Sequence, residues 1–120
     1  MGTPLSERLV TGIAAADETA IAACFTEDVQ FRALIPPGLR ERSGASEAGS
    51  LIAAWFKDST VLELVDAETS EVGDRLRISY LFTGVEEGAP YIVEQHLFCS
   101  VRDGRIERAD LLCSGFRERS

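Results

Sequence analysis

Residues 61–116 read VLELVDAETSEVGDRLRISYLFTGVEEGAPYIVEQHLFCSVRDGRIERADLLCSGF, and this half of the chain decides the fold. Several of its stretches alternate apolar with polar residues, which is typical of half-buried β-strands. Turn signals rich in glycine and charge separate the stretches, at Gly73-Asp74, at 86–90 and at Asp103-Gly104. We therefore expect four long strands joined as antiparallel hairpins, at 61–72, 76–82, 91–101 and 106–116.

The first half of the chain shows helical spacing. Leu5, Leu9 and Ile13 fall on one face of a predicted first helix, and Asp17 can cap a short second helix. A strand is predicted at 29–35, and residues 40–43 are expected to form a charged loop. A third helix should then begin at Ser43 or Gly44 and run through the apolar residues Leu51, Ile52, Trp55 and Phe56.

This order, α-α-β-α-β-β-β-β, predicts an α+β fold rather than an alternating α/β fold. Three N-terminal helices should pack on the concave side of a curved antiparallel sheet. The length of 120 residues is that of one domain, so we expect a single domain over 1–120.

Composition excludes several classes of function. The formal net charge of −8 argues against nucleic acid and anionic membranes as partners, because both require a basic surface. No stretch reaches the ~20 apolar residues of a membrane helix, and the first 25 residues contain no signal-peptide apolar region. Three cysteines without CxxC spacing suggest reduced thiols, so we expect a cytoplasmic protein. With one histidine and no glycine-rich phosphate loop, we expect no metal and no cofactor.

Four short phrases resemble the nuclear-transport-factor-2-like superfamily, also called SnoaL-like or ketosteroid-isomerase-like. They are CFTEDV at 24–29, Arg42-Ser43-Gly44, Trp55-Phe56, and RDGRI at 102–106. The resemblance implies a cone-shaped fold with one pocket, often dimerising through its sheet. It also implies a small apolar organic molecule as partner. Two functions stay open: a cofactor-independent acid/base enzyme (isomerase, cyclase or hydrolase), and a non-catalytic ligand-binding or dimerisation module.

The enzymes of this superfamily supply templates for a site. Ketosteroid isomerase uses a tyrosine and two aspartates, but alignment places Leu9 at the tyrosine, Ala33 at the base and His96 or Leu97 at the oxyanion aspartate. We therefore do not expect that activity with its usual residues. SnoaL-type cyclases, which have a histidine and an aspartate on the last two strands, resemble this chain better, and they imply catalytic roles for His96 and Asp110.

Whether His96 meets Asp110 depends on the register of the last hairpin. A two-residue turn at Asp103-Gly104 places Asp110 opposite Leu97, whereas a three-residue loop places it opposite His96. The three-residue loop separates apolar from polar side chains on the two faces, so we favour it. Glu94 would then point the same way, giving the candidate catalytic residues His96, Asp110 and Glu94.

Other interpretations of these residues stay open. The face carrying Glu94, His96 and Asp110 is also typical of a solvated outer sheet surface with cross-strand ion pairs, or of a dimer interface. Pocket walls are expected from Phe31, Trp55, Phe56 and Tyr80. We predict a homodimer through the outer sheet face, with an apolar stripe of Val93, Leu97, Val101 and Leu111. If that stripe instead faces the core, Glu94 and His96 lie outside and the proposed site is lost.

Overall fold

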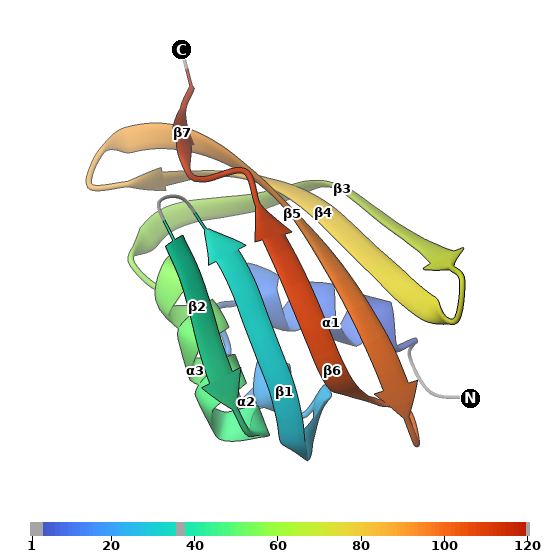
Figure 1. Cartoon of the computed structure of the whole chain (residues 1–120). Helices are drawn as coiled ribbons and strands as arrows, with labels where there is room; N and C mark the ends of the chain where they lie inside the picture. The colour runs from blue at the N-terminus through green and yellow to red at the C-terminus, as the bar shows by residue number, and fades with distance from the viewer. Residues whose placement is uncertain (1–3, 36–37, 120) are drawn as a thin grey trace.

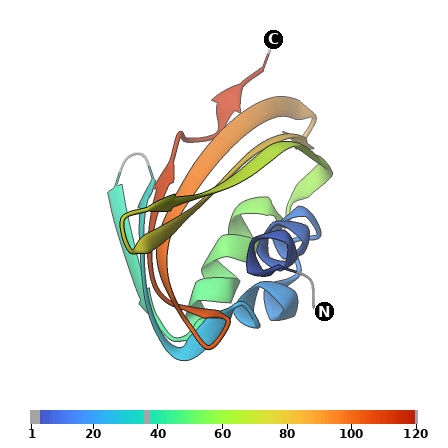
Figure 2. The ribbon, with the colours of Figure 1, turned by 90° about the vertical axis from the view of Figure 1, so that its right-hand side faces the viewer.

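A curved sheet wraps around three helices in the computed structural model, which describes residues 4–35 and 38–119 (Figures 1 and 2). The helices are α1 (Leu5–Ala14), α2 (Glu18–Ala22) and α3 (Ala45–Phe56). The strands are β1 (Phe25–Ile35), β2 (Gly38–Ser43), β3 (Ser59–Val72), β4 (Arg75–Glu86), β5 (Ala89–Arg102), β6 (Arg105–Cys113) and β7 (Arg117–Glu118). The predicted α+β class, with its early helices and late hairpins, is confirmed.

The sheet differs from the prediction at its margins. Residues expected to form a charged loop make the edge strand β2, which pairs on one side with β1. Charged side chains are common on edge strands, because they discourage pairing with the edge of another sheet. The strand order is β2-β1-β6-β5-β4-β3, with the short β7 paired to β5. The β1–β6 pair is parallel, so the sheet is mixed rather than antiparallel throughout.

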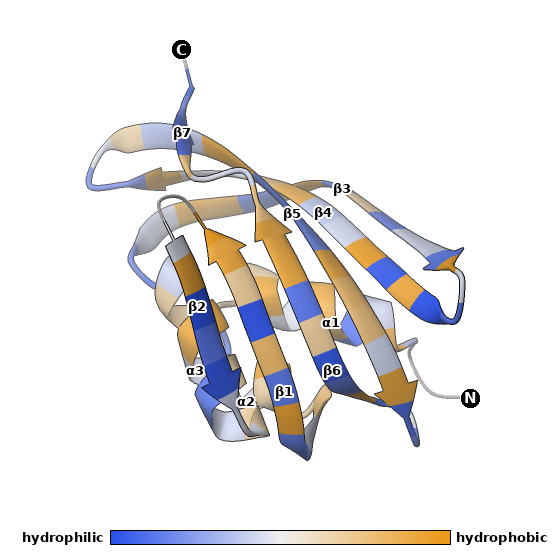
Figure 3. Cartoon of the chain, in the orientation of Figure 1, coloured by the Kyte–Doolittle hydropathy of each residue, from blue (hydrophilic) through white to orange (hydrophobic). Residues whose placement is uncertain are grey.

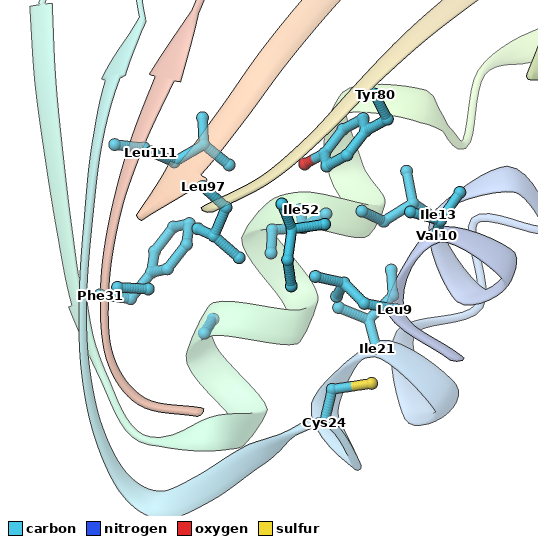
Figure 4. Close-up of a cluster of buried hydrophobic side chains, with 14 of the residues drawn as sticks. Leu9, Val10, Ile13, Ile21, Cys24, Phe31, Ile52, Tyr80, Leu97 and Leu111 are labelled. Carbon is cyan, nitrogen blue, oxygen red and sulfur yellow. The ribbon is translucent and has the colours of Figure 1, made fainter. Parts of the chain in front are cut away.

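Apolar and polar residues alternate along the strands (Figure 3). The burial of these residues alternates in the same way, which separates a buried concave face from an outer face. On β5, Val93, Leu97 and Cys99 are almost fully buried, whereas the residues between them are more exposed. Side chains from the sheet and all three helices meet in one apolar core, in which Phe31, Leu97 and Tyr80 point towards the helices (Figure 4). Burial of this core is the main force that holds the helices against the sheet.

Local signals position the helices. The Asp17 carboxylate accepts a hydrogen bond from the Ala20 backbone N–H at 3.1 Å and caps α2, as predicted. Gly49 allows α2 and α3 to approach closely, because a Cβ atom there would lie 2.9 Å from the Ala22 Cβ. The third helix ends at Phe56, as expected from the sequence.

The last hairpin does not have the favoured register. Asp103 and Gly104 both have positive φ, of 52° and 78°, so they form a two-residue turn. The ladder then shifts between Ser100 and Val101, and Glu107 is the extra residue of a β-bulge. Beyond the bulge Phe98 lies opposite Asp110, so the three-residue loop and the His96–Asp110 pairing are wrong.

The apolar stripe predicted for a dimer interface faces the core instead. Val93, Leu97 and Leu111 are at most 1% exposed and pack under the helices, so they cannot contact a second chain. Val101 lies beyond the bulge and is 43% exposed. The alternative stated with the prediction therefore holds: Glu94 and His96 lie on the outer face.

Candidate functional site

The sequence-predicted catalytic residues lie on the outer face of the sheet and have separate partners. His96 lies opposite Leu112, and its Nε2 is 3.3 Å from a carboxylate oxygen of Glu94. Asp110 accepts hydrogen bonds from Arg32 at 2.8 Å and Arg75 at 2.9 Å. The structure therefore brings His96 together with Glu94 but does not pair His96 with Asp110.

Two guanidinium groups hold Asp110 as a carboxylate. Partial burial alone would raise the pKa of Asp110, but the hydrogen bonds and charges of Arg32 and Arg75 outweigh burial and lower it. Arg75 also donates to the Phe98 carbonyl, so this cluster links β1, β6, β5 and β4. The arrangement is that of a structural ion cluster, because both carboxylate oxygens are occupied.

Asp110→Asn is expected to lower the free energy of unfolding by about 1 kcal/mol at pH 7, because the cluster is partly solvated. The pKa of Asp110 is lower in the folded state than in the unfolded state, where it is about 4. The cluster therefore stabilises the fold fully above the unfolded pKa, and this stabilisation is lost as the pH falls through the folded-state pKa. The difference in free energy of unfolding between wild type and Asp110→Asn should therefore vanish in acid. Urea unfolding at several pH values measures this difference, with the exposed residue change Asp66→Asn as control. A constant difference down to pH 2 would contradict the assignment.

A second polar group lies on the concave face, inside the core. The Tyr80 hydroxyl donates a hydrogen bond of 2.7 Å to the Gln95 side-chain carbonyl. The Gln95 amide in turn donates to the Cys113 sulfur at 3.4 Å. Tyr80 is 2% exposed and Gln95 is fully buried, whereas Cys113 is partly exposed. The group, here called the inner polar chain, therefore runs from the core to the end of β6.

Burial keeps the Tyr80 hydroxyl of the inner polar chain uncharged. It raises the pKa of Tyr80 far above its ordinary value, with a smaller contribution from Cys113, so the hydroxyl stays protonated at neutral pH. Gln95 has no ionisable group. The inner polar chain can therefore donate and accept hydrogen bonds, but it offers no carboxylate or imidazole for proton abstraction.

An aromatic cluster lies beside the inner polar chain. Ring centroids lie 5.7 Å apart for Tyr80 and Phe82, 5.6 Å for Phe82 and Phe56, and 5.5 Å for Phe56 and Phe116. Phe116 also lies 5.1 Å from Tyr91 and is 40% exposed. Aromatic contacts therefore lead from Tyr80 to the surface at the segment between β6 and β7.

The predicted pocket walls are largely core. Phe31, Phe56 and Tyr80 are at most 2% exposed, and Trp55 is partly exposed and packs against the core. The positions aligned with the ketosteroid isomerase tyrosine and base, Leu9 and Ala33, are also buried among apolar side chains. Surface hollows open elsewhere, for example between α2 and α3 and on the outer face of the sheet. The pocket itself stays a prediction.

Sequence reasoning missed Gln95, although a signal for it was present. Gln95 lies between Val93 and Leu97 in the alternating pattern of β5, on the same face of the strand. It therefore faces the core if they do. The Tyr80 position opposite it follows from the β4–β5 ladder, in which the two residues are direct partners. A glutamine inside an apolar stripe is unusual because its amide needs buried partners.

With this geometry the chain can be compared with known proteins. Residues 6–109 match the SnoaL-like domain. The chain belongs to this family. Comparison with curated proteins finds no match.

Solved structures share the fold of this SnoaL-like domain. A candidate isomerase from Bacillus subtilis has a TM-score of 0.74 at 15% identity, covering 93% of this chain and 90% of that one. A candidate polyketide cyclase from Xanthomonas campestris has a TM-score of 0.71 at 23% identity, covering 90% and 86%. A third structure is a hypothetical protein from Catenulispora acidiphila with a ketosteroid isomerase-like fold, in complex with trimethylamine. Its TM-score is 0.71 at 16% identity, covering 92% of this chain and 85% of that one.

Two features of the described residues bear on its partners. No helix among residues 4–35 and 38–119 is long and apolar enough to cross a membrane. The same residues contain no group of three histidine, cysteine or acidic side chains that could hold a metal ion.

Burial raises the pKa of Cys99 to about 11, although the charge of nearby Arg75 lowers it, so this thiol stays protonated at neutral pH.

Proposed function

We propose that this SnoaL-like domain binds a small, uncharged and largely apolar molecule that carries a hydrogen-bonding oxygen. The inner polar chain carries the proposal, because Tyr80 and Gln95 form a neutral hydrogen-bonding pair inside a largely apolar core. Ligand sites typically combine apolar surface with a few such polar groups that fix orientation. A charged ligand is disfavoured because no described charged group lies within the core to compensate it.

We propose that the ligand enters where Phe116 closes the interior. The ring of Phe116 rests on buried Phe56 and Tyr91 while 40% of its own surface stays exposed. The stretch between β6 and β7 lies outside regular strand structure, and its Gly115 has a φ of 84°. Moving Phe116 aside would expose the aromatic cluster and the Cys113 end of the inner polar chain.

Prodan tests the binding proposal, because this dye is a neutral aromatic ketone whose fluorescence reports the polarity around it. We expect saturable binding with one dye per chain and an emission shift to shorter wavelength. Phe116→Ala should strengthen binding by opening the entrance. Emission that rises linearly with protein, without saturation, would overturn the proposal.

The acid/base alternative is tested with acetophenone in D2O. A base beside the bound carbonyl would exchange the methyl protons next to that carbonyl for deuterium. Because the inner polar chain holds no base, we expect exchange at the rate of the buffer alone. Accelerated exchange, lost on Tyr80→Phe, would replace the binding function with a catalytic one.

We further propose that the chain forms a homodimer through its outer sheet face. Leu39, Leu34 and Leu112 are neighbours in one row across β2, β1 and β6, and each is 48–50% exposed. Exposed apolar rows of this kind often contact a second copy. Light scattering at ~50 µM should give twice the chain mass of 13.1 kDa, and Leu112→Glu should restore the monomer. A wild-type mass of 13.1 kDa would refute this proposal.

A further inference from the structure

A hollow with a volume of about 400 Å³ lies on the outer face where β1, β2 and β6 meet. It is separate from the inner polar chain, because the sheet lies between them. Its lining is dominated by polar and charged side chains: Gln30, Arg32, Glu41, Arg42, Ser43, Arg108 and Asp110, with Phe31. The strand register explains this grouping, since Ser43, Gln30 and Arg108 form one row across the sheet and Glu41, Arg32 and Asp110 form the next.

Three guanidinium groups of this hollow keep donors available. Arg32 uses its Nε for Asp110, which leaves both of its terminal nitrogens without a hydrogen bond to any described residue. Arg42 donates from one terminal nitrogen to the Glu41 carbonyl. The Arg108 side chain makes no hydrogen bond or ion pair with any described residue, although it lines the hollow. Arg108 and Arg32 belong to these two rows, whereas Arg42 lies opposite Phe31 in the row between them, on the edge strand β2.

The local charge is opposite to that of the whole chain. Arg32, Arg42 and Arg108 carry three positive charges against the two negative charges of Glu41 and Asp110. Arg75 pairs with the second oxygen of Asp110 from outside the hollow, which raises the local excess to two positive charges. In a chain with a formal net charge of −8, this is a concentrated positive site.

We propose that this hollow binds a small dianion of the phosphate-monoester class. Guanidinium groups bind phosphate through paired N–H donors, and arginine is preferred where such planar recognition is needed. Arg108 and the free ends of Arg32 and Arg42 would hold the phosphate oxygens. Asp110 keeps Arg32 in place through its Nε, which leaves the terminal nitrogens of Arg32 available to an anion.

Inorganic phosphate and phenyl phosphate are the probes, titrated by calorimetry at pH 7.5 with chloride held constant. We expect saturable binding of one anion per chain, and tighter binding of phenyl phosphate if a monoester is preferred. Arg108→Gln should weaken binding at least about tenfold, because it removes a charged donor pair. Arg42→Gln is a second variant that breaks no ion pair, and it should weaken binding as well.

Arg119→Gln is the matched control, since Arg119 is an exposed arginine on the C-terminal segment far from β2 along the sheet. It should change binding by less than twofold. Equal losses in Arg108→Gln and Arg119→Gln would show nonspecific attraction and overturn the site, as would the absence of saturation in wild type. Circular dichroism of each variant checks that the fold is retained. Prodan binding should be unaffected by Arg108→Gln, so the two proposed sites fail or succeed separately.

Discussion

Phe56→Ala is expected to lower the free energy of unfolding by about 3–5 kcal/mol, the range typical of a buried phenylalanine. Phe56 is 1% exposed and lies at the end of α3, where its ring contacts both Phe82 on β4 and Phe116 near the C-terminus. Removing it leaves a cavity where helix, sheet and C-terminal segment meet. Urea unfolding followed by circular dichroism measures the loss.

Trp55→Ala provides the matched control for that substitution. Trp55 is the neighbouring aromatic residue on the same helix, but it is only partly buried. Although tryptophan is the larger side chain, we expect the smaller loss, because part of its surface is already in water. Equal losses, or a larger loss at Trp55, would mean that the two residues have been assigned to the wrong environments.

The double variant Tyr80→Phe/Gln95→Leu is expected to fold with nearly wild-type stability and to bind Prodan at least about tenfold more weakly. Replacing both partners of a buried hydrogen bond by apolar groups of similar shape is nearly neutral for stability. Each single variant, in contrast, leaves one buried polar group unsatisfied and should cost about 1–3 kcal/mol. If the proposed function holds, the inner polar chain should therefore contribute more to binding than to stability.

This pattern separates a ligand-binding role from a structural one. If the Tyr80–Gln95 pair only stabilised the core, the double variant would bind Prodan as well as wild type. His96→Asn is the control on the outer face of the same strand, and it should leave Prodan binding unchanged. Tight binding by the double variant, or a loss in His96→Asn, would contradict the proposed site.

The sequence allowed the strand faces to be predicted more reliably than the strand partners. The alternation on β5 and β6 correctly placed Val93, Leu97 and Leu111 together and His96 with Asp110 on the opposite face. Every second residue of a pleated strand lies on the same face of the sheet, so the residues that share a face can be derived from the sequence alone. Which of the two faces the helices cover does not follow from one hairpin, and the dimer stripe was assigned to the wrong side for that reason.

The register could not be derived because two local irregularities compensate. The two-residue turn at Asp103-Gly104 shifts the ladder by one residue from the favoured three-residue loop, and the bulge at Glu107 shifts it by one more. The faces are therefore those predicted, while the cross-strand partner of Asp110 is Phe98 instead of His96. The bulge brings Ile106 and Ala109 to the same buried face although they are three residues apart in the sequence, so strict alternation does not hold across Glu107.

The parts of the candidate site that escaped prediction depend on long-range contacts. Arg32 and Asp110 are 78 residues apart and meet only because β1 and β6 pair in parallel. The contact of Phe116 with Phe56 likewise joins the C-terminal segment to the end of α3. Neither contact has a local signature, because each depends on the order of strands in the sheet.

The most direct test of the inner site is an NMR titration of 15N-labelled wild-type protein with acetophenone, a neutral and water-soluble aromatic ketone. Gln95 is fully buried and its side-chain amide is observable, so it reports on the interior without a substitution. We expect saturable shift changes at the Gln95 side-chain amide and at the backbone amides of Tyr80, Cys113 and Phe116. Shift changes confined to Glu94, His96 and Asp110 on the outer face would contradict the account.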